Sequence, residues 1–197
     1  MEVIKVNVKD NMVFLRSFMQ NPKHIGSVIP SSRFLAKKMV TQAPWGEMKA
    51  IAELGSGTGA ITRHISNHVT DSMKVLMFEM NDTMRTSLEQ EFPQYSSYKN
   101  AANLVECMKQ QHIEQLDCIF SGLPFFNFES ELRETLVDQI HQALKPRGLF
   151  IAFQYSLQMK KKLSEHFTIE TIPFVPLNIP PAFVYVCRKK ETLLNHS

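Results

Sequence analysis

The segment Ala50–Thr62, which reads AIAELGSGTGAIT, constrains the fold of this chain more than any other stretch. A short apolar run ends at Glu53, glycines follow at positions 55, 57 and 59, and a helical pattern begins directly after them. Glycine permits a sharp turn and lets a ligand approach the backbone where a Cβ would clash. The helix that follows directs N–H groups and the positive end of its dipole toward that ligand. The segment therefore predicts a nucleotide site made of a strand, a glycine turn and a helix N-terminus.

Two nucleotide cofactors are compatible with this turn. The spacing Gly55-x-Gly57-x-x-Ala60 satisfies the dinucleotide fingerprint, which admits alanine at its last position. The spacing Glu53-x-Gly55-x-Gly57-x-Gly59 resembles instead the acidic, alternating-glycine motif of S-adenosylmethionine methyltransferases. A carboxylate two residues before the first glycine would repel a pyrophosphate, whereas it suits a cationic ligand that carries an amine. We therefore expect S-adenosylmethionine rather than NAD as the cofactor.

A second acidic residue supports this interpretation. Glu79 ends the next apolar run, Lys74-Val-Leu-Met-Phe-Glu79, and lies 20 residues beyond Gly59. At that spacing, a carboxylate at the tip of the second strand reaches the ribose hydroxyls of a bound nucleotide.

The composition predicts one globular domain, or one domain with a small appendage. The chain has 197 residues, of which 44% are hydrophobic and 21% charged. It has no apolar run near the ~20 residues that span a bilayer, and its first residues lack the layout of a secretion signal. Three cysteines without a pattern indicate reduced thiols rather than disulfides or a zinc site. We expect a cytoplasmic, monomeric protein. A bound metal is not expected, because His64 and His68 have no obvious further ligand.

The positive charge is concentrated in the N-terminal fifth of the chain. Residues 1–40 hold seven Lys or Arg and two acidic residues, whereas the remaining residues hold 15 and 17. Such a segment predicts contact with a polyanion, either a nucleic acid or an anionic membrane surface. A solvated basic helix without a partner has the same composition.

Two helices are expected in this basic segment. The first spans residues 10–20, and its apolar stripe with Phe14 and Phe18 suits either a core or a membrane interface. The second begins at Ser31 or Ser32 as N-cap and runs to about residue 42, with lysines and an arginine on one side. We expect a basic helical segment over residues 1–45 that docks on the membrane and covers the active site, a catalytic domain over 46–190 and a tail over 191–197.

From residue 49 onward, strand and helix patterns alternate, which implies a mostly parallel sheet with helices on both faces. The expected strands are 49–54, 74–79, 95–98, 116–121, 148–154, 167–175 and 182–188. The expected helices are 60–69, 81–91, 102–112, 130–144 and 156–165. Because no helix separates the last two strands, they must pair antiparallel. This predicts an α/β, Rossmann-like class I methyltransferase fold with seven strands and an antiparallel C-terminal hairpin.

The segment Asp117–Phe128 is a second candidate for function. An apolar strand ends at Ser121, and Leu123-Pro124 then direct the chain over the carboxyl edge of the sheet, where ligands bind in open α/β folds. Backbone carbonyls freed by such a turn can accept hydrogen bonds from an amine and orient its lone pair. The phenylalanines that follow would form an apolar or cation-stabilising wall, or would cover the core.

Four segments together give the chain a family resemblance: Gly26-Ser-Val-Ile-Pro-Ser-Ser32, Glu53-Leu-Gly-Ser-Gly-Thr-Gly59, Ser121-Gly-Leu-Pro124, and Asn178-Ile-Pro-Pro-Ala182 with Val184-Tyr185. In this order they resemble the bacterial class I phospholipid N-methyltransferases, which convert phosphatidylethanolamine stepwise to phosphatidylcholine. The rRNA adenine dimethylases are more distantly similar. The glycine motif is general to class I methyltransferases, and the other three segments indicate the substrate.

The resemblance, with the acidic residues and glycines above, implies a role for each motif. Cofactor contacts are expected from Ser31, Ser32, Glu53, Gly55, Ser56, Gly57, Thr58, Gly59, Thr62, Glu79, Met80, Ala101, Ala102 and Ser121. Methyl transfer is expected at Ser121, Gly122, Leu123, Pro124 and Tyr155, and acceptor binding at Phe125, Phe126, Asn178, Pro181 and Tyr185. Membrane contact is expected from Lys9, Phe14, Arg16, Phe18, Lys37 and Lys38.

The chain departs from the family pattern after the third strand. Family members often carry Gly-Asp-Ala there, with the aspartate on the adenine amine, whereas this chain reads Asn100-Ala101-Ala102. Backbone groups or Asn103 would then have to hold the adenine.

Two other methyl acceptors remain open, a small soluble amine and the adenine of an rRNA. An RNA enzyme would use the basic N-terminus on phosphates, but it usually carries an added RNA-binding domain. The resemblance favours a phospholipid amine at an anionic membrane surface, with nucleic acid as the less expected partner.

Overall fold

The computed structural model describes residues 32–190. The predicted helix over 10–20 and the predicted site residues Lys9, Phe14, Arg16, Phe18 and Ser31 lie outside the described residues.

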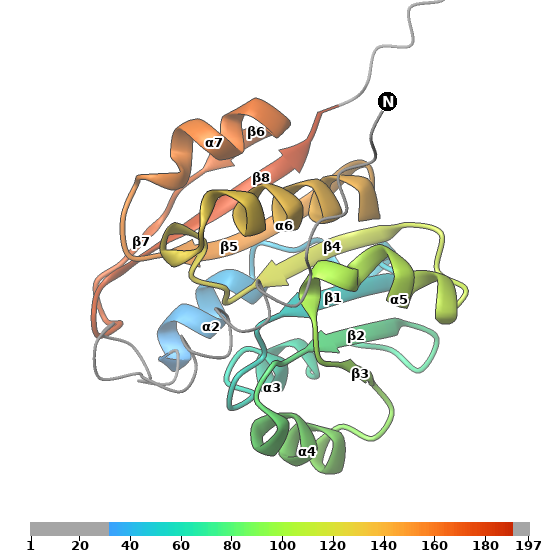
Figure 1. Cartoon of the computed structure of the whole chain (residues 1–197). Coiled ribbons are helices and arrows are strands. Elements are labelled where there is room, and N and C mark those ends of the chain that lie inside the picture. The colour runs from blue at the N-terminus through green and yellow to red at the C-terminus, as the bar shows by residue number, and fades with distance from the viewer. Residues whose placement is uncertain (1–31, 191–197) are drawn as a thin grey trace, which may run out of the picture.

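A single mixed sheet forms the centre of the described chain (Figure 1). Its order is β3 (Ser96–Tyr98), β2 (Lys74–Phe78), β1 (Ala50–Leu54), β4 (Leu116–Ser121), β5 (Leu144–Gln154), β8 (Ala182–Lys189) and β6 (Phe167–Thr171), with β7 (Phe174–Val175) paired to β8. The strands β3 to β5 are parallel, and β8 is antiparallel to β5, β6 and β7. The predicted fold class is confirmed, but the sheet of residues 32–190 has eight strands rather than the predicted seven, because β6 and β7 replace one expected strand.

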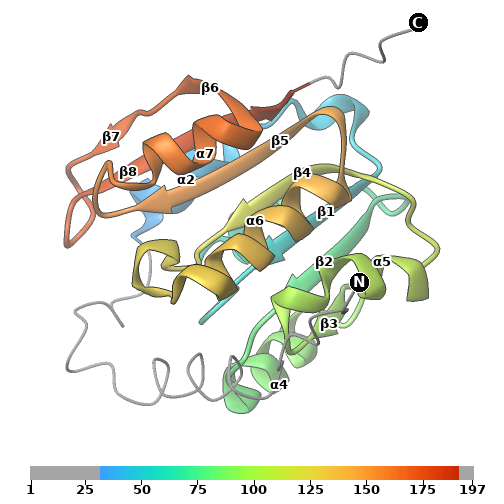
Figure 2. The same cartoon turned by 45° about the horizontal axis from the view of Figure 1, so that its top comes forward.

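Helices cover both faces of the sheet, as Figures 1 and 2 show. The helices α2 (Arg33–Val40), α3 (Thr62–Ile65) and α4 (Asp82–Glu91) contribute to one buried cluster, and α5 (Leu104–Gln110), α6 (Ser130–Ala143) and α7 (Met159–His166) contribute to the other. Short 3-10 turns are η2 (Trp45–Glu47), η3 (Ala101–Asn103) and η4 (Phe125–Asn127). Within residues 32–190 the predicted strands and helices are present, and the largest differences in extent concern α3, β5 and the strand predicted over 167–175.

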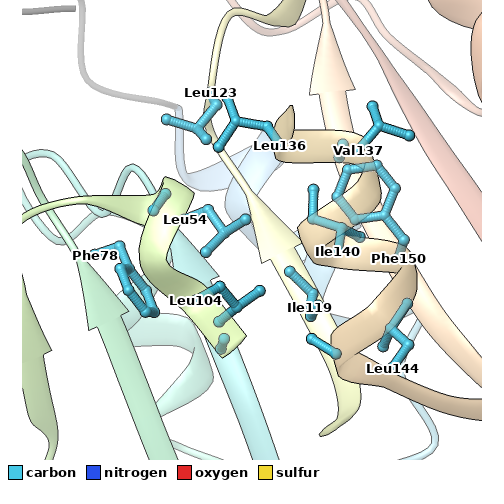
Figure 3. Close-up of a cluster of buried hydrophobic side chains, with 14 of the residues drawn as sticks. Leu54, Phe78, Leu104, Ile119, Leu123, Leu136, Val137, Ile140, Leu144 and Phe150 are labelled. Carbon is cyan, nitrogen blue, oxygen red and sulfur yellow. The ribbon is translucent and has the colours of Figure 1, made fainter. Parts of the chain in front are cut away.

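The sheet separates two hydrophobic cores because successive side chains of a strand point to opposite faces. On β2, Val75 and Met77 join the cluster under α2, α3 and α4, whereas Leu76 and Phe78 join the cluster under α5, α6 and α7. Figure 3 shows the second cluster, where Leu104 faces residues of the sheet. Burial on both faces explains why these strands read as continuous apolar runs.

The helix after the glycine turn is shorter than predicted. The pattern predicts residues 60–69, but α3 spans only Thr62–Ile65. The Ser66 hydroxyl and the Asn67 amide both donate to the Arg63 carbonyl, at 3.0 and 3.1 Å. Serine and asparagine side chains that bond to the backbone in this way compete with a continuing helix.

Two strands also differ from the prediction. The strand β5 begins at Leu144 rather than at 148, because Leu116 pairs with Leu144 and Cys118 with Leu149, so that residues 145–148 bulge out of the ladder. The predicted strand 167–175 is divided into β6 and β7, which pair with different parts of β8. Pro173 lies in the break, and proline has no N–H for a ladder.

The helix α2 packs into the core of the catalytic domain. Its residues Leu35, Ala36, Met39 and Val40 are buried in the same cluster as β1 and β4. The part of the predicted segment 1–45 that the structure describes is therefore continuous with the packing of the domain.

Candidate active site

The glycine turn connects β1 to α3 at the carboxyl edge of the sheet. Gly55, Gly57 and Gly59 have φ values of 76°, 55° and 81°, in the left-handed region that favours glycine. The N–H groups of Gly55 and Ser56 donate to the Phe78 carbonyl, at 2.8 and 3.0 Å, which ties the turn to the end of β2. A Cβ at Gly57 would meet no atom within 4 Å, so this position opens onto free space.

Glu79 lies directly against this turn. It follows β2 and is only 3% exposed. Its carboxylate accepts hydrogen bonds from the Gly57 N–H at 2.7 Å and from the Asn81 N–H at 2.8 Å. Burial raises the pKa of Glu79, and the N–H groups of Asn81 and Gly57 oppose that rise. The structure therefore brings the second predicted acid to the glycine turn.

Glu53 is the more deeply buried acid, with 0% exposure. The Thr62 hydroxyl donates to its Oε2 at 2.7 Å. Burial raises the pKa of Glu53 to about 7, the Thr62 hydrogen bond opposes the rise, and the nearby charge of Glu79 adds to it. Within residues 32–190, Oε1 of Glu53 and the Ser56 hydroxyl are buried and make no hydrogen bond of good geometry, although Ser56 lies near enough to Glu53 to lower its pKa.

These features fit S-adenosylmethionine, which carries a sulfonium and an ammonium group. Two buried carboxylates favour a cation, and the orphaned Oε1 of Glu53 marks unused acceptor capacity beneath the turn. The open space at Gly57 allows the ligand to approach the backbone. When bound, this cofactor supplies the methyl group that is transferred. The same two acids would oppose the pyrophosphate of NAD.

The loop after β4 packs directly against the glycine turn. A Cβ at Gly122 would lie 2.9 Å from the Gly55 carbonyl oxygen, and a Cβ at Gly55 would lie 2.9 Å from Cδ2 of Leu123. The Gly122 N–H donates to the Leu54 carbonyl at 2.9 Å, and Ser121 Oγ accepts from the Leu123 N–H at 3.2 Å. Figure 3 shows Leu123 at the edge of the buried cluster. The two predicted motifs thus share one interface.

Gln154 also belongs to this site, although the sequence interpretation omitted it. Its Nε2 donates to the Leu123 carbonyl at 2.9 Å, and the side chain is only 5% exposed. A polar residue at the end of the apolar strand β5 is the signal that could have identified it. The Phe125 N–H also donates to the Leu123 carbonyl at 3.0 Å, so this carbonyl has partners within the protein.

The aromatic residues of the loop separate into two groups. Phe125 and Phe128 are 1% and 3% exposed and pack edge to face at 6.2 Å between ring centroids, so they belong to the core. Phe126 is 50% exposed. Of the predicted acceptor residues Phe125 and Phe126, only Phe126 has its ring at the surface.

Asn178 joins two motifs that are far apart in the sequence. Its Oδ1 accepts from the Ser32 N–H at 2.9 Å, and its Nδ2 donates to the Pro180 carbonyl at 2.7 Å. The Ser32 side chain caps α2 by accepting from the Leu35 N–H at 3.2 Å, as predicted for one of the two serines. Asn178 is 2% exposed, so it holds α2 and the β7–β8 loop together, and Pro181 beside it is exposed.

The two predicted tyrosines differ in position. Tyr155 is 37% exposed beyond β5 and packs edge to face on Phe153 at 5.6 Å. Tyr185 is fully buried, and its hydroxyl donates to the Ser156 carbonyl at 3.0 Å. Burial raises the pKa of Tyr185 to about 12. Its hydroxyl supports the loop that carries Tyr155 from below, and the structure does not bring it to the surface beside Phe126.

The remaining predicted cofactor residues line the same edge. Met80 is buried behind Glu79, and Thr58 is exposed at the tip of the glycine turn. Ala101 is buried and Ala102 half-buried in η3, and the Asn100 side chain accepts from the Ala102 N–H at 3.0 Å. Asn103, the other candidate for adenine, is exposed.

Lys37 and Lys38 lie in the last turn of α2, with Lys37 exposed and Lys38 half-buried. Within residues 32–190, no group of three or more His, Cys, Asp or Glu could hold a metal ion. None of the helices in this same range has the length and apolar character needed to cross a membrane.

Known proteins share this architecture and part of this sequence. A family model for a methyltransferase domain matches residues 51–148. An ornithine lipid N-methyltransferase of Singulisphaera acidiphila is 32% identical over 186 residues, which cover 92% of this chain and 97% of that protein. The chain belongs to this family of lipid N-methyltransferases. The predictions of the family, of an S-adenosylmethionine-dependent N-methyltransferase and of its cofactor are therefore confirmed.

Solved structures of other methyltransferases share the fold of this enzyme. The 1,6-didemethyltoxoflavin N1-methyltransferase of Burkholderia thailandensis is 14% identical with a TM-score of 0.69, and the match covers 97% of this chain and 94% of that one. A TehB-like methyltransferase of Corynebacterium glutamicum is 20% identical with a TM-score of 0.59 and covers 92% and 100%. At these identities the likeness concerns the fold alone.

Proposed function

We propose that this enzyme transfers the methyl group of S-adenosylmethionine to the primary amine of a membrane-lipid head group. The observation that carries the proposal is the contact between Gly122 and Gly55, which joins an acidic cofactor site to an aromatic, apolar acceptor loop. The relative named for ornithine lipid supports a lipid acceptor. The sequence resemblance supports phosphatidylethanolamine, converted toward phosphatidylcholine.

The loop after β4 is proposed to orient the amine. The carbonyls of Leu123 and Pro124 accept hydrogen bonds from Phe125 and Asn127 within the loop. We propose the backbone carbonyls of Ser121 and Gly122, at the end of β4, as candidates to accept from the amine N–H groups. The exposed ring of Phe126 supplies an apolar wall that also stabilises a cation over its face.

The amine must be neutral to act as a nucleophile. Asp82, a candidate base at this edge, forms ion pairs with Lys99 at 2.8 Å and Arg85 at 2.7 Å. Hydrogen bonds from these two cations lower the pKa of Asp82 to about 2, so its carboxylate is a weak base. We propose that burial of the amine against apolar side chains lowers its own pKa, without a dedicated base.

The enzyme is further proposed to be a cytoplasmic monomer that binds the membrane peripherally. The basic and aromatic residues Lys9, Phe14, Arg16 and Phe18, together with Lys37 and Lys38, supply charge and apolar area for reversible binding to an anionic leaflet.

Incubation with radiolabelled S-adenosylmethionine tests the function directly. The acceptors, offered separately, are vesicles with phosphatidylethanolamine, vesicles with ornithine lipid, ribosomal RNA and small soluble amines. We expect label in one of the two lipids, and its identity assigns the head group. Label in a small amine or in RNA, with none in either lipid, would overturn the proposal.

A further inference from the structure

The exposed large hydrophobic side chains of the described chain gather at one edge of the molecule. Across residues 32–190 there are seven of them, and we call this set the apolar rim: Phe34, Phe126, Tyr155, Leu157, Phe174, Leu177 and Ile179. A scattered exposed leucine needs no explanation, but a contiguous apolar patch marks a binding surface.

Contacts between segments show that the parts of the chain that carry the apolar rim lie next to one another. Its members follow β4 and β5, lie in β7 or between β7 and β8, or lie in the first turn of α2. The end of β5 lies beside the start of β8 in the sheet, since Gln154 pairs with Phe183. Hydrogen bonds connect Gln154 to Leu123, Ser156 to Tyr185, and Ser32 to Asn178. In both Figures 1 and 2, β7 and the start of β8 lie on the same side as α2 and the loop after β4. The rim therefore lies on the acceptor side of the active site.

The loop between β7 and β8 is built to display two of these side chains. Leu177 and Ile179 are 61% and 72% exposed, while Asn178 between them is buried and bonded on both sides. The loop also contains Pro176, Pro180 and Pro181, which restrict the backbone. Such bracing holds both apolar side chains outward instead of letting them collapse onto the core.

The segments that carry the rim contain cations and no acidic residues. The segments 32–42, 122–128, 154–162 and 172–182 contain no Asp or Glu, and their Lys and Arg are Arg33, Lys37, Lys38, Lys160, Lys161 and Lys162. Lys162 forms ion pairs with Glu134 and Glu165 at 2.5 and 3.1 Å, so its charge is compensated within the protein. An apolar surface bordered by cations matches the interface of an anionic bilayer, which takes apolar groups below its phosphates.

We propose that the apolar rim is a bilayer-docking surface that seats the acceptor side of the active site on anionic lipid. Leu177 and Ile179 enter the interface, and the lysines of α2 and of the start of α7 remain at the phosphates. The rim is a fixed part of the catalytic domain, separate from the residues before Ser32. The inference rests on the proposed lipid substrate, since a head group reaches the site only if the site faces the membrane.

A fluorescent label at the rim tests the contact itself. The three native cysteines are all buried, so Leu177→Cys in the full chain supplies one accessible thiol for bimane. Lys49→Cys is the matched control, because Lys49 is exposed beside the start of β1, at the opposite edge. We expect vesicles of phosphatidylglycerol and brominated phosphatidylcholine to quench the first label and not the second. Equal quenching at both positions, or none at Leu177→Cys while the protein floats with the vesicles, would overturn the inference.

Flotation of full-length variants measures the strength of docking. We expect the double variant L177S/I179S to bind these vesicles about tenfold less at low and at high salt, because the lost contact is apolar. K160Q/K161Q should weaken binding at low salt only, because salt screens the lost attraction. The control K49Q/K109Q removes the same charge elsewhere and should leave binding unchanged. Unchanged flotation of L177S/I179S, or a wild-type dimer that this variant converts to a monomer, would contradict bilayer docking.

The activity of the same variant separates this inference from the proposed function. L177S/I179S should bind S-adenosylhomocysteine and methylate a dihexanoyl amino lipid below its micelle concentration as the wild type does. A wild-type enzyme that docks through the rim but methylates no amino lipid would overturn the proposed function and leave the docking surface standing. A variant that loses methylation of the short-chain lipid as well would place these residues in substrate binding and overturn docking as their role.

Discussion

The two halves of the carboxyl edge of the sheet carry different kinds of residue. At the ends of β1 and β2, two carboxylates are buried beneath a turn of glycines with positive φ. Around the ends of β4 and β5 and the start of β8, the exposed large side chains are aliphatic or aromatic, and no acidic side chain of residues 32–190 is buried there. Gly55 and Gly122 bring the halves into backbone contact.

The difference follows from the ligands that the two halves are suited to bind. A small charged cofactor is recognised by fixed backbone groups and buried charge, which must be organised before binding. An acceptor anchored in a bilayer arrives by burial of apolar surface, which requires exposed side chains and little directional bonding. Substitutions in the first half should therefore change cofactor affinity, and those in the second should change the response to lipid.

The largest effect is expected from Gly57→Ala. A Cβ at this position meets no protein atom, so the fold loses only the cost of a left-handed alanine, about 1–2 kcal/mol. The methyl group occupies the space through which the cofactor approaches, and affinity for S-adenosylhomocysteine should fall by about 100-fold or more by calorimetry. Gly46→Ala is the matched control, because its Cβ also meets nothing and its φ is not positive. An unchanged affinity of Gly57→Ala would contradict the assigned cofactor site.

Asn178→Ala should reduce stability more than cofactor affinity. It leaves the Ser32 N–H and the Pro180 carbonyl without their partner, at a cost of about 1–3 kcal/mol in the free energy of unfolding. Denaturant titration measures this loss, and Asn67→Ala, a change at an exposed asparagine, should cost less than about 0.5 kcal/mol. Affinity for S-adenosylhomocysteine should not change. A larger effect on cofactor affinity than on stability would instead place Asn178 in the cofactor half.

The pH dependence of cofactor binding should depend on Glu53. Its pKa of about 7 means that ionisation, which favours a cationic ligand, increases from pH 6 to pH 8. If the ionised form binds, affinity should rise about tenfold over this range. The free energy of unfolding of the free protein should instead fall by about 1 kcal/mol between pH 6 and pH 8. The reason is that the raised pKa of Glu53 makes ionisation of its buried carboxyl unfavourable in the folded state.

Glu53→Gln should flatten both of these profiles, as measured by calorimetry and by denaturant titration at each pH. Asp82→Asn is the control, because its carboxyl has a pKa of about 2 and stays ionised throughout the range. An affinity profile that keeps its slope in Glu53→Gln would show that another group controls binding.

The smallest effect is expected from Phe126→Ala. The ring is 50% exposed, so its loss should leave the free energy of unfolding within about 0.5 kcal/mol of the wild type. The KM for a lipid amine should rise about threefold, through loss of apolar contact, with affinity for S-adenosylhomocysteine unchanged. A loss of cofactor affinity instead would show that the two halves are not separable at this residue.

Much of the cofactor half could be predicted from the sequence, because its determinants are local. The spacing of Glu53, Gly55, Gly57 and Gly59 defines one turn, and the distance to Glu79 is fixed by one crossover of a parallel sheet. The alternation of strands and helices determined the fold class and the antiparallel end of the sheet in the same way. The sequence did not predict that α3 ends at Ile65. The side chains of Ser66 and Asn67 both donate to the Arg63 carbonyl and so compete with a continuing helix.

Only the tertiary structure decided the acceptor half. The sequence does not distinguish Phe125, which fills the core, from Phe126, which lies at the surface, since the difference depends on how η4 rotates over Phe150. Likewise, Asn178 and Tyr185 belong to a motif that predicts substrate contact, but Asn178 bonds to Ser32 and Tyr185 to Ser156. Contacts between segments 146 residues apart in the chain depend on the packing of the whole sheet, which no local pattern encodes.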